Sequence, residues 1–264
     1  MTVEFIELDW RGDRVRIEHE WLDADRPDAP LLIFLHEGLG SRSMWRDFPQ
    51  QLCTAAGGRG LVYSRPGYGR STPRSPDERW GADFMHRQAN ELLPALRQAL
   101  HIEQRAWLVG HSDGASIALL HAAQYPDAVA GLVLMAPHLF VEQVSVGSIE
   151  RTRELFNSTD LAQRLARHHD DVDSAFWGWN DIWLDPAFRG WNIEAEVARI
   201  RCPVLAIQGI ADEYGTMEQI RRIRQHLPSA QLLELADCGH SPHRDQPDQV
   251  VAASAGFIAA ASAA

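Results

Sequence analysis

Short runs of apolar residues recur along the chain and alternate with segments of helical spacing. The run Leu31–Leu35 is apolar at every position, which is typical of a strand buried on both faces of a sheet. Other runs that predict strands lie at 60–63, 106–109, 129–135, 203–208 and 231–235. Strands separated by helices predict an α/β fold, with a mostly parallel sheet covered by helices on both faces.

The start of the chain follows a different pattern, because two strand-like segments come directly after one another. Residues 3–8 and 14–19 predict two strands joined through Gly12 as a hairpin. The segment 85–100 places its apolar residues on one helical face, but Pro94 predicts a kink or a break in this helix. Further helices are predicted at 45–56, 112–124, 217–227 and 247–263.

The alternation of strands and helices is interrupted between residues 138 and 197, where no buried-strand pattern is found. This segment contains four of the nine tryptophans: Trp177, Trp179, Trp183 and Trp191. We therefore predict a core made of residues 1–137 and 198–264, with a helical cap inserted at 138–197. Two interpretations of these tryptophans remain open, since they either line a pocket or only pack the cap onto the core.

Composition and charge limit the possible classes of function. The chain has 264 residues, of which 45% are hydrophobic, enough for one α/β domain with an insertion. Its formal net charge of −11 argues against a nucleic-acid partner and against binding to an anionic membrane surface. We interpret the charge as a contribution to solubility.

The cysteines and the first residues of the chain indicate the cellular compartment of the protein. Cys53, Cys202 and Cys238 are far apart and odd in number, so they predict neither a disulfide framework nor a metal site. The chain begins Met-Thr-Val-Glu-Phe, without the basic and apolar regions of a secretory leader, and no run approaches the roughly 20 apolar residues of a membrane span. We expect a cytoplasmic protein with reduced thiols.

The segment Gly110-His111-Ser112-Asp113-Gly114 is a Gly-x-Ser-x-Gly pentapeptide between a predicted strand and a predicted helix. A serine hydroxyl is a poor nucleophile unless the backbone presents it in the open beside a base. A sharp strand-to-helix turn does this, and its glycines allow close passage of neighbouring backbone. Ser112 is therefore the candidate nucleophile.

A nucleophilic serine needs a base, and the base needs an orienting carboxylate. Asp212 and His240 both follow predicted strands, where a parallel sheet places its functional groups, and the order Ser, acid, His is that of a nucleophile-elbow hydrolase. The alternatives are His243 for the base, and Glu213 or Asp237 for the acid.

The strand Leu31–Leu35 leads into a glycine-containing loop, residues 36–41. Such a loop allows backbone N–H groups to point at a developing alkoxide, and the N–H of Asp113, at the start of a helix, is a second candidate donor. The loop has neither the Gly-x-Gly-x-x-Gly pattern nor the Lys-Ser/Thr ending of a phosphate-binding loop.

The chain resembles the α/β-hydrolase family through five motifs in the family order: His36-Glu37-Gly38, the loop 64–71, Gly110–Gly114, Gly209-Ile210-Ala211-Asp212 and Gly239-His240. The resemblance extends from near Val3 to the C-terminus and is interrupted by the cap. It implies an eight-stranded, mostly parallel sheet with a lid over a serine-hydrolase pocket. It also implies Ser112 as nucleophile, Asp212 as acid, His240 as base, and the backbones of Gly38 and Asp113 as oxyanion donors.

The chain departs from the family pattern at two positions. Glu37 stands where the family usually has glycine, so the loop N–H that faces the oxyanion is less certain. We expect the Glu37 side chain to face outward or to form a salt bridge, although a position near the pocket is the alternative. Ser64 stands where the family loop often has aspartate, which we expect to alter local packing rather than chemistry.

The resemblance implies acyl transfer to water, and a carboxylesterase for small to medium esters is the first hypothesis. Thioesters, lactones and carbon–carbon bonds are alternative substrates, as is a low-turnover ligand-binding role. Epoxide hydrolases and dehalogenases of the family use an aspartate nucleophile. Because Ser112 stands at the nucleophile position here, it argues against both of these activities. Carbon–carbon hydrolases often have an aromatic residue after the catalytic histidine, whereas Ser241 follows His240 here.

The substrate is expected to be a small-molecule ester held in an apolar pocket formed by Leu39, Trp179 and Trp183. No metal or cofactor is expected, because a triad generates its own nucleophile. The pair His168-His169 is expected on the surface, whereas the position of His138 relative to the pocket is left open, as is the oligomeric state.

Overall fold

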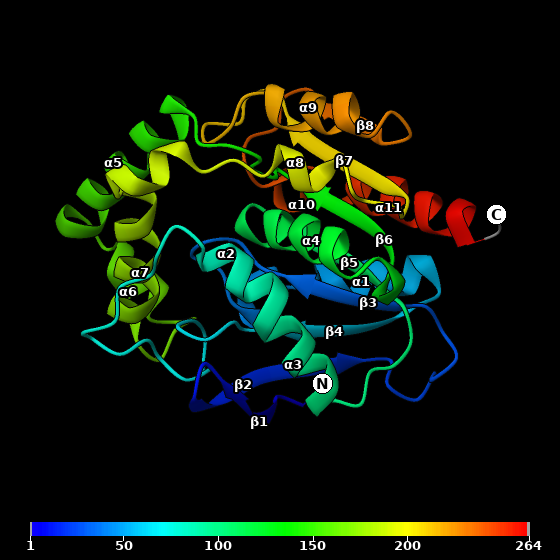
Figure 1. The fold of residues 1–264 in the computed structure, drawn as a ribbon, viewed down its shortest axis with the longest axis horizontal. Helices are drawn as coiled ribbons and strands as arrows, with labels where there is room; N and C mark the ends of the chain where they lie inside the picture. The colour runs from blue at the N-terminus through cyan, green and yellow to red at the C-terminus, as the bar shows by residue number, and fades with distance from the viewer. Residues whose placement is uncertain (1, 263–264) are drawn as a thin grey trace.

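The computed structural model describes residues 2–262 and contains one sheet of eight strands (Figure 1). The order across the sheet is β1-β2-β4-β3-β5-β6-β7-β8. Strands β1 and β2 pair antiparallel, β2 pairs antiparallel with β4, and the other pairs are parallel. The strands are β1 (Glu4–Trp10), β2 (Asp13–Leu22), β3 (Leu31–Leu35), β4 (Arg59–Tyr63), β5 (Ala106–His111), β6 (Val129–Met135), β7 (Val204–Gly209) and β8 (Gln231–Leu235). The prediction of an eight-stranded, mostly parallel sheet is confirmed.

The central strands form where the sequence is continuously apolar. Every residue of β3, β5 and β7 is buried, because helices cover both faces of the sheet at these positions. The parallel register pairs Leu35 with Gly110 and His111 with Met135. The carboxyl ends of β3, β5 and β6 therefore lie side by side, and the loops that follow them meet at one edge of the sheet.

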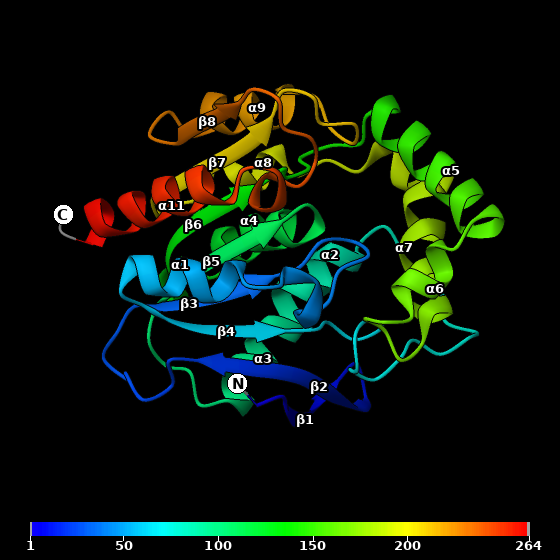
Figure 2. The same ribbon diagram turned by 180° about the vertical axis from the view of Figure 1, so that it is seen from behind.

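Helices cover the two faces of the sheet unequally (Figures 1 and 2). One face packs against α1 (Phe48–Ala56) and α11 (Pro247–Ser262), through side chains such as Leu52 and Phe257. The other face packs against α2 (Phe84–Arg87), α3 (Leu93–Ala99), α4 (Asp113–Gln124) and α9 (Glu218–His226). The predicted end of the last helix at Ala263 lies outside the described residues.

The helix predicted at 85–100 is interrupted, as Pro94 indicated. A single π-helical turn, Gln88–Leu92, separates α2 from α3, and Pro94 lies in the first turn of α3. A proline in a continuous helix would lack one N–H and crowd the carbonyl one turn earlier, and the wider turn accommodates it.

Residues 138–197 are folded as helices and turns, without a strand of the sheet. The helices are α5 (Gln143–Ser158), α6 (Leu161–Leu165), α7 (Val172–Leu184) and α8 (Glu194–Val197). Figure 1 shows α5, α6 and α7 grouped beyond the carboxyl ends of the central strands, whereas α8 packs against α4 and α9. An isolated β-bridge between Phe140 and Asn192 joins the two ends of this segment.

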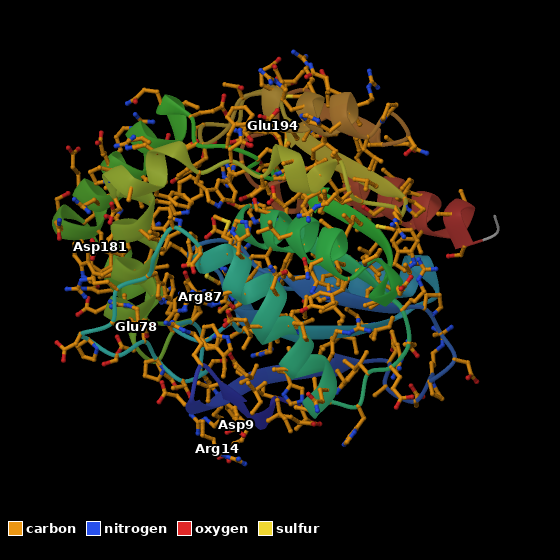
Figure 3. All side chains as sticks on the ribbon, in the orientation of Figure 1. Asp9, Arg14, Glu78, Arg87, Asp181 and Glu194 are labelled. Carbon is orange, nitrogen blue, oxygen red and sulfur yellow. The ribbon has the colours of Figure 1, made fainter. Side chains whose placement is uncertain are left out.

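Charged side chains are distributed around the outside of the molecule. Figure 3 shows Asp9, Arg14, Asp181 and Glu194 at its periphery. Many are paired, as in the contact of 2.8 Å between Arg14 Nε and Glu7 Oε2. Among the helices of residues 2–262, none has both the length and the hydrophobicity needed to cross a membrane.

Candidate active site

Ser112 occupies a strained turn between β5 and α4. Its φ of 53° and ψ of −121° lie in a region that a residue with a side chain rarely adopts, which costs about 1–3 kcal/mol. The flanking glycines are required by close packing, since a Cβ at Gly114 would lie 2.0 Å from the carbonyl oxygen of Leu35. A Cβ at Gly110 would lie 2.6 Å from the backbone nitrogen of Ala115. The turn therefore presents the Ser112 hydroxyl at the edge of the sheet.

His240 and Asp212 lie next to Ser112 in the folded chain. His240 Nε2 is 3.0 Å from Ser112 Oγ, and His240 Nδ1 is 2.9 and 3.0 Å from the two carboxylate oxygens of Asp212. The side chain of Asp212 is only 1% exposed and that of His240 is 12% exposed. Three residues that are distant in the sequence thus form one hydrogen-bonded chain from hydroxyl to imidazole to carboxylate.

The Asp212 carboxylate is held ionised by its hydrogen bonds. Burial alone would raise its pKa, but the hydrogen bond and charge of His240 and the N–H of Tyr214 outweigh burial, so the pKa lies below its ordinary value. Tyr214 N and Gly215 N donate to Asp212 Oδ1, and Gln208 Nε2 donates to Oδ2. The carboxylate is therefore fixed as an acceptor for His240 Nδ1.

The alternative base and acids lie elsewhere. His243 is buried between Trp45 and Phe48, and its ring nitrogens have no hydrogen-bond partner among residues 2–262. Within the described part of the chain, Glu213 Oε2 accepts only from the backbone N–H of His240, and Asp237 lies in a turn with a φ of 52°. The structure thus brings Asp212 and His240, and not these alternatives, to Ser112.

Glu37 is half-buried; it lines the same cavity as Ser112 and forms the predicted salt bridge. Its Oε1 lies 3.1 Å from Arg244 Nη2, and its Oε2 lies 3.5 Å from His111 Nδ1. Burial alone would raise the pKa of Glu37, but contacts with His111 and Arg244 hold it well below its ordinary value. His111 Nε2 in turn donates to the backbone carbonyl of His240 at 2.7 Å. Glu37 therefore supports the loop that carries His240.

The loop after β3 is held through its carbonyl groups. Arg65, fully buried, donates to the carbonyl of Glu37 at 2.8 Å. Because the C=O and N–H of a trans peptide point in opposite directions, this bond turns the N–H of Gly38 away from Arg65. Gly38 lines the same cavity as Ser112, and a Cβ at Gly38 would lie 2.2 Å from the indole of Trp179.

His168 and His169 are not the surface pair that we expected. His169 is only 4% exposed; its Nε2 donates to the carbonyl of Leu39 at 3.1 Å, and its Nδ1 accepts from Gly69 N. His168 is half-buried and contacts Ser43 Oγ at 2.8 Å. The expectation was wrong because both rings are covered by loops that are remote in the sequence, and His169 braces the loop after β3.

Asp113 contributes both a backbone group and a buried acid. Its N–H is the first of α4 and has no hydrogen-bond partner among the described residues. Its side chain is fully buried, and Oδ1 accepts from Trp183 Nε1 at 3.2 Å. Burial raises the pKa of this carboxyl to about 6, against the opposing charge of Arg65.

A cavity of about 330 Å³ lies over Ser112 and His240. Most of its wall is apolar and includes Leu39, Trp179 and Trp183, the three residues predicted to contact substrate. Helices α5, α6 and α7 each supply part of this wall, through residues such as Ile149, Leu161 and Leu165. The cavity is therefore formed jointly by the sheet edge and by the segment 138–197.

His138 is a residue of this site that sequence reasoning did not place. It lines the cavity, and its Nε2 lies 3.4 Å from Ser112 Oγ. The available signal was its position shortly after β6, the neighbour of β5 in the sheet.

Ser64, the second departure from the family pattern, supports packing near the loop. Its hydroxyl donates to Glu18 Oε2 at 2.7 Å and accepts from the backbone N–H of Arg42 at 2.9 Å. Glu18 is 2% exposed, so a carboxylate is still buried beside position 64, supplied by β2.

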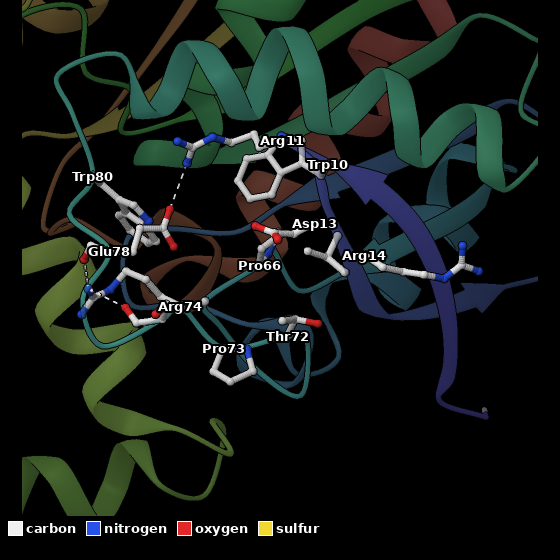
Figure 4. Close-up of a pocket in the computed structure, with 13 residues that line it drawn as sticks. Trp10, Arg11, Asp13, Arg14, Pro66, Thr72, Pro73, Arg74, Glu78 and Trp80 are labelled. Atoms are coloured by element: carbon white, nitrogen blue, oxygen red, sulfur yellow. Dashed lines mark hydrogen bonds and ion pairs between the residues drawn. The ribbon is translucent and has the colours of Figure 1, made fainter.

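A larger cleft of about 550 Å³ lies elsewhere, between the β1–β2 turn and the loop 66–80 (Figure 4). Its lining includes Trp10, Trp80 and Arg74, with Arg11 paired to Glu78 at 2.9 Å. No histidine is among its lining residues in the described chain. Within residues 2–262, no group of three His, Cys, Asp or Glu side chains is arranged to hold a metal ion.

The chain is similar in sequence to known hydrolases. A family model described as "Alpha/beta hydrolase family" matches residues 32–253. The chain is 23% identical to 2-hydroxy-6-oxo-6-phenylhexa-2,4-dienoate hydrolase from Burkholderia cepacia, over 98% of this chain and 96% of that protein. It is 25% identical to sn-1-specific diacylglycerol lipase ABHD11 from Mus musculus, over 92% and 85% of the two chains.

Solved structures give the same fold. A thermophilic esterase from Thermogutta terrifontis superposes with a TM-score of 0.75 at 18% identity and covers 99% of both chains. The enol-lactonase from Burkholderia xenovorans LB400 superposes with a TM-score of 0.74 at 20% identity, over 96% of this chain and 99% of that one.

Proposed function

The chain belongs to the alpha/beta hydrolase family, and from this premise we propose that it is a serine hydrolase that cleaves carboxylic esters of small to medium acyl or alcohol groups. The observation that carries the proposal is the hydrogen-bonded chain from Ser112 through His240 to Asp212. This arrangement supplies a nucleophile, a base within hydrogen-bond reach of it, and a carboxylate that orients the base.

The proposed reaction proceeds through an acyl-enzyme. Ser112 Oγ attacks the ester carbonyl while His240 Nε2 takes the hydroxyl proton, and His240 then gives this proton to the leaving alcohol. Asp212 holds His240 in the tautomer with hydrogen on Nδ1 and stabilises the imidazolium as it forms. Water then attacks the acyl group by the same steps and releases the carboxylic acid.

The N–H groups of Gly38 and Asp113 are the proposed oxyanion donors. The orientation of the Glu37–Gly38 peptide and the free first N–H of α4 both support this role. Loss of one such donor typically costs about 3–4 kcal/mol of transition-state stabilisation. No cofactor takes part in these steps, and the substrate is a small molecule.

Residues 138–197 are proposed to form a cap over a core of residues 1–137 and 198–264. The contribution of α5, α6 and α7 to the wall of the cavity supports this division. Leu39, Trp179 and Trp183 are the proposed contacts for the apolar part of the substrate, because such walls favour acyl or alkyl groups. The cap would also exclude water from the ester.

A carbon–carbon bond hydrolase is the second candidate, favoured by the similarity of nearly the whole chain to a dienoate hydrolase. Lactone and thioester cleavage use the same acyl-enzyme chemistry and remain alternatives within the proposal. A panel of acyl esters, thioesters, lactones and vinylogous diketones, assayed on one preparation, distinguishes them by kcat/KM. Carbon–carbon cleavage that is faster than ester cleavage would replace the first proposal by the second.

The basic experiment measures release of p-nitrophenol from the acetate and butyrate esters, with Ser112→Ala as the control. The proposal requires release that depends on Ser112. Equal release by both proteins, or none by either, would instead favour a low-turnover ligand-binding role for this fold.

A further inference from the structure

His138 reaches Ser112 from the side of the sheet occupied by β6. Met135, the last residue of β6, pairs in register with His111, which precedes Ser112. The backbone of His138 is clamped to α4 by Ser116, whose hydroxyl accepts from His138 N at 3.0 Å and donates to its carbonyl at 2.6 Å. The position of His138 is therefore fixed relative to the nucleophile.

The ring of His138 is enclosed by aromatic side chains. It is 3% exposed and packs edge-on against Trp183, with ring centroids 4.9 Å apart, and its centroid lies 5.7 Å from that of His240. Burial, together with the neighbouring His240 and against the charge of Asp212, lowers its pKa to about 3. His138 is thus neutral at physiological pH and carries one hydrogen on its ring.

The neighbouring hydrogen bonds determine which nitrogen carries that hydrogen. An ionised Asp212 only accepts, so His240 Nδ1 donates to it, and the Nε2 of neutral His240 accepts the Ser112 hydroxyl hydrogen. The hydroxyl then has no hydrogen left for His138. A hydrogen bond between Ser112 Oγ and His138 therefore requires the hydrogen on His138 Nε2. The remaining nitrogen, Nδ1, has no partner among the described residues.

We propose that His138 is a further catalytic residue, whose Nε2–H donates to Ser112 Oγ and stabilises that oxygen as it leaves the acyl group during deacylation. This inference rests on the proposed ester hydrolysis. The separation of 3.4 Å in the free protein is longer than the usual range of about 2.7–3.2 Å, and catalytic hydrogen bonds commonly shorten as charge develops.

The step is balanced without a further reactant. Water adds to the acyl carbon and gives a proton to His240 Nε2, which forms a tetrahedral intermediate. The bond between this carbon and Ser112 Oγ then breaks, its electron pair moves to Oγ, and His240 returns the proton to Oγ. The His138 hydrogen stays on Nε2 throughout and only strengthens its bond to Oγ.

Deacylation should depend on His138 more than acylation does. The free serine hydroxyl is a good acceptor, so His138 stabilises the resting enzyme and the acylation transition state to similar extents. In the acyl-enzyme, Oγ is an ester oxygen and a poorer acceptor, so the bond to His138 gains strength as Oγ becomes negative. Removing the donor should therefore slow deacylation selectively.

The test compares His138→Leu, which removes the donor, with His138→Gln, which keeps an N–H near the same position. For an activated p-nitrophenyl ester, kcat/KM reports acylation and kcat reports deacylation, and acid quench with mass spectrometry gives the fraction of acylated Ser112. His121→Leu is the matched control, because His121 is another buried histidine, bonded to the carbonyl of Ala89 instead of to Ser112.

For His138→Leu we expect kcat to fall about 10-fold, kcat/KM to change less than about threefold, and the acylated fraction to rise. His138→Gln should recover most of kcat, and His121→Leu should keep the ratio of the two constants. Equal losses in kcat and kcat/KM without more acyl-enzyme, or no difference between Leu and Gln, would overturn the role of His138. Absence of Ser112-dependent turnover in the wild-type protein would overturn the proposed function itself.

Discussion

Two cavities of this molecule differ in the burial of their polar groups more than in their size. The cleft beside the β1–β2 turn is larger, about 550 Å³ against about 330 Å³ for the cavity over Ser112. Its ion pair, Arg11 with Glu78, has side chains that are 37% and 31% exposed, so water screens the interaction. The pair Asp212 and His240 is 1% and 12% exposed. Burial of polar groups, rather than volume, separates the two sites.

The difference has a physical basis. In the smaller cavity, polar groups face apolar walls, where unscreened interactions shift pKa values and fix tautomers. In the larger cleft, the pair formed by Arg11 and Glu78 is about a third exposed, so water screens it. The first environment favours proton transfer, and the second favours only modest stabilisation of the fold.

The largest expected contrast between the cavities concerns their serines. Ser112→Ala should lower kcat/KM for p-nitrophenyl butyrate by at least about 10⁴-fold, because the proposed nucleophile is lost. Ser75→Ala, at an exposed serine of the larger cleft, should change it less than twofold. A comparable loss of kcat/KM in Ser75→Ala would contradict the claim that only the smaller cavity carries out the reaction.

The carboxylates provide the next contrast. Asp212→Asn should lower kcat by about 10³–10⁴-fold, since an amide no longer holds the hydrogen on His240 Nδ1. Asp13→Asn, at an exposed acid of the larger cleft, is the matched control and should retain full activity. Steady-state kinetics of both variants measure these changes in kcat. A loss of kcat below tenfold for Asp212→Asn would contradict the role of Asp212 in orienting His240.

The titration of the buried acid Asp113 tests whether water is excluded from the smaller cavity. Its pKa is raised to about 6, so the folded state favours the protonated form, and stability is lost as pH rises from about 4 through about 6. The wild-type protein is compared with Asp113→Asn, which has no titrating group at this position. The difference in free energy of unfolding, wild type minus variant, should be about 2 kcal/mol smaller at pH 7.5 than at pH 4.5. Urea unfolding measures this change, and an equal difference at both pH values would contradict it.

The smallest contrast concerns the tryptophans. Trp179→Ala should raise KM for p-nitrophenyl hexanoate by about tenfold and for the acetate by less than about twofold, because longer acyl groups lose more apolar contact. Trp10→Ala, in the larger cleft, should leave both KM values unchanged. Equal effects of Trp179→Ala on all chain lengths would show that this indole only packs the fold.

Much of the fold was predictable because buried parallel strands leave continuous apolar runs, as in Leu31–Leu35. Ser112, Asp212 and His240 could be selected because each follows a strand and lies in a recognisable local pattern. A single sequence does not show that these three side chains are in contact. The contact could still be expected, because parallel strands place the loops after their carboxyl ends next to one another.

The remaining features depend on contacts that carry no local pattern. His138 and His169 lie in loops without periodicity, and their roles arise from Ser112 and Leu39, which are remote along the chain. The expectation that His169 lies on the surface failed for this reason. The larger cleft likewise forms between two loops whose proximity only the folded chain determines.

The most direct test of the account is to locate the adduct of a fluorophosphonate probe, which reacts with an activated serine, by digestion and mass spectrometry. We predict one adduct per folded chain, on Ser112, with none on Ser75 and none after denaturation. Failure of the folded protein to react, or modification of Ser75 as readily as Ser112, would contradict the claim that the smaller cavity holds the nucleophile.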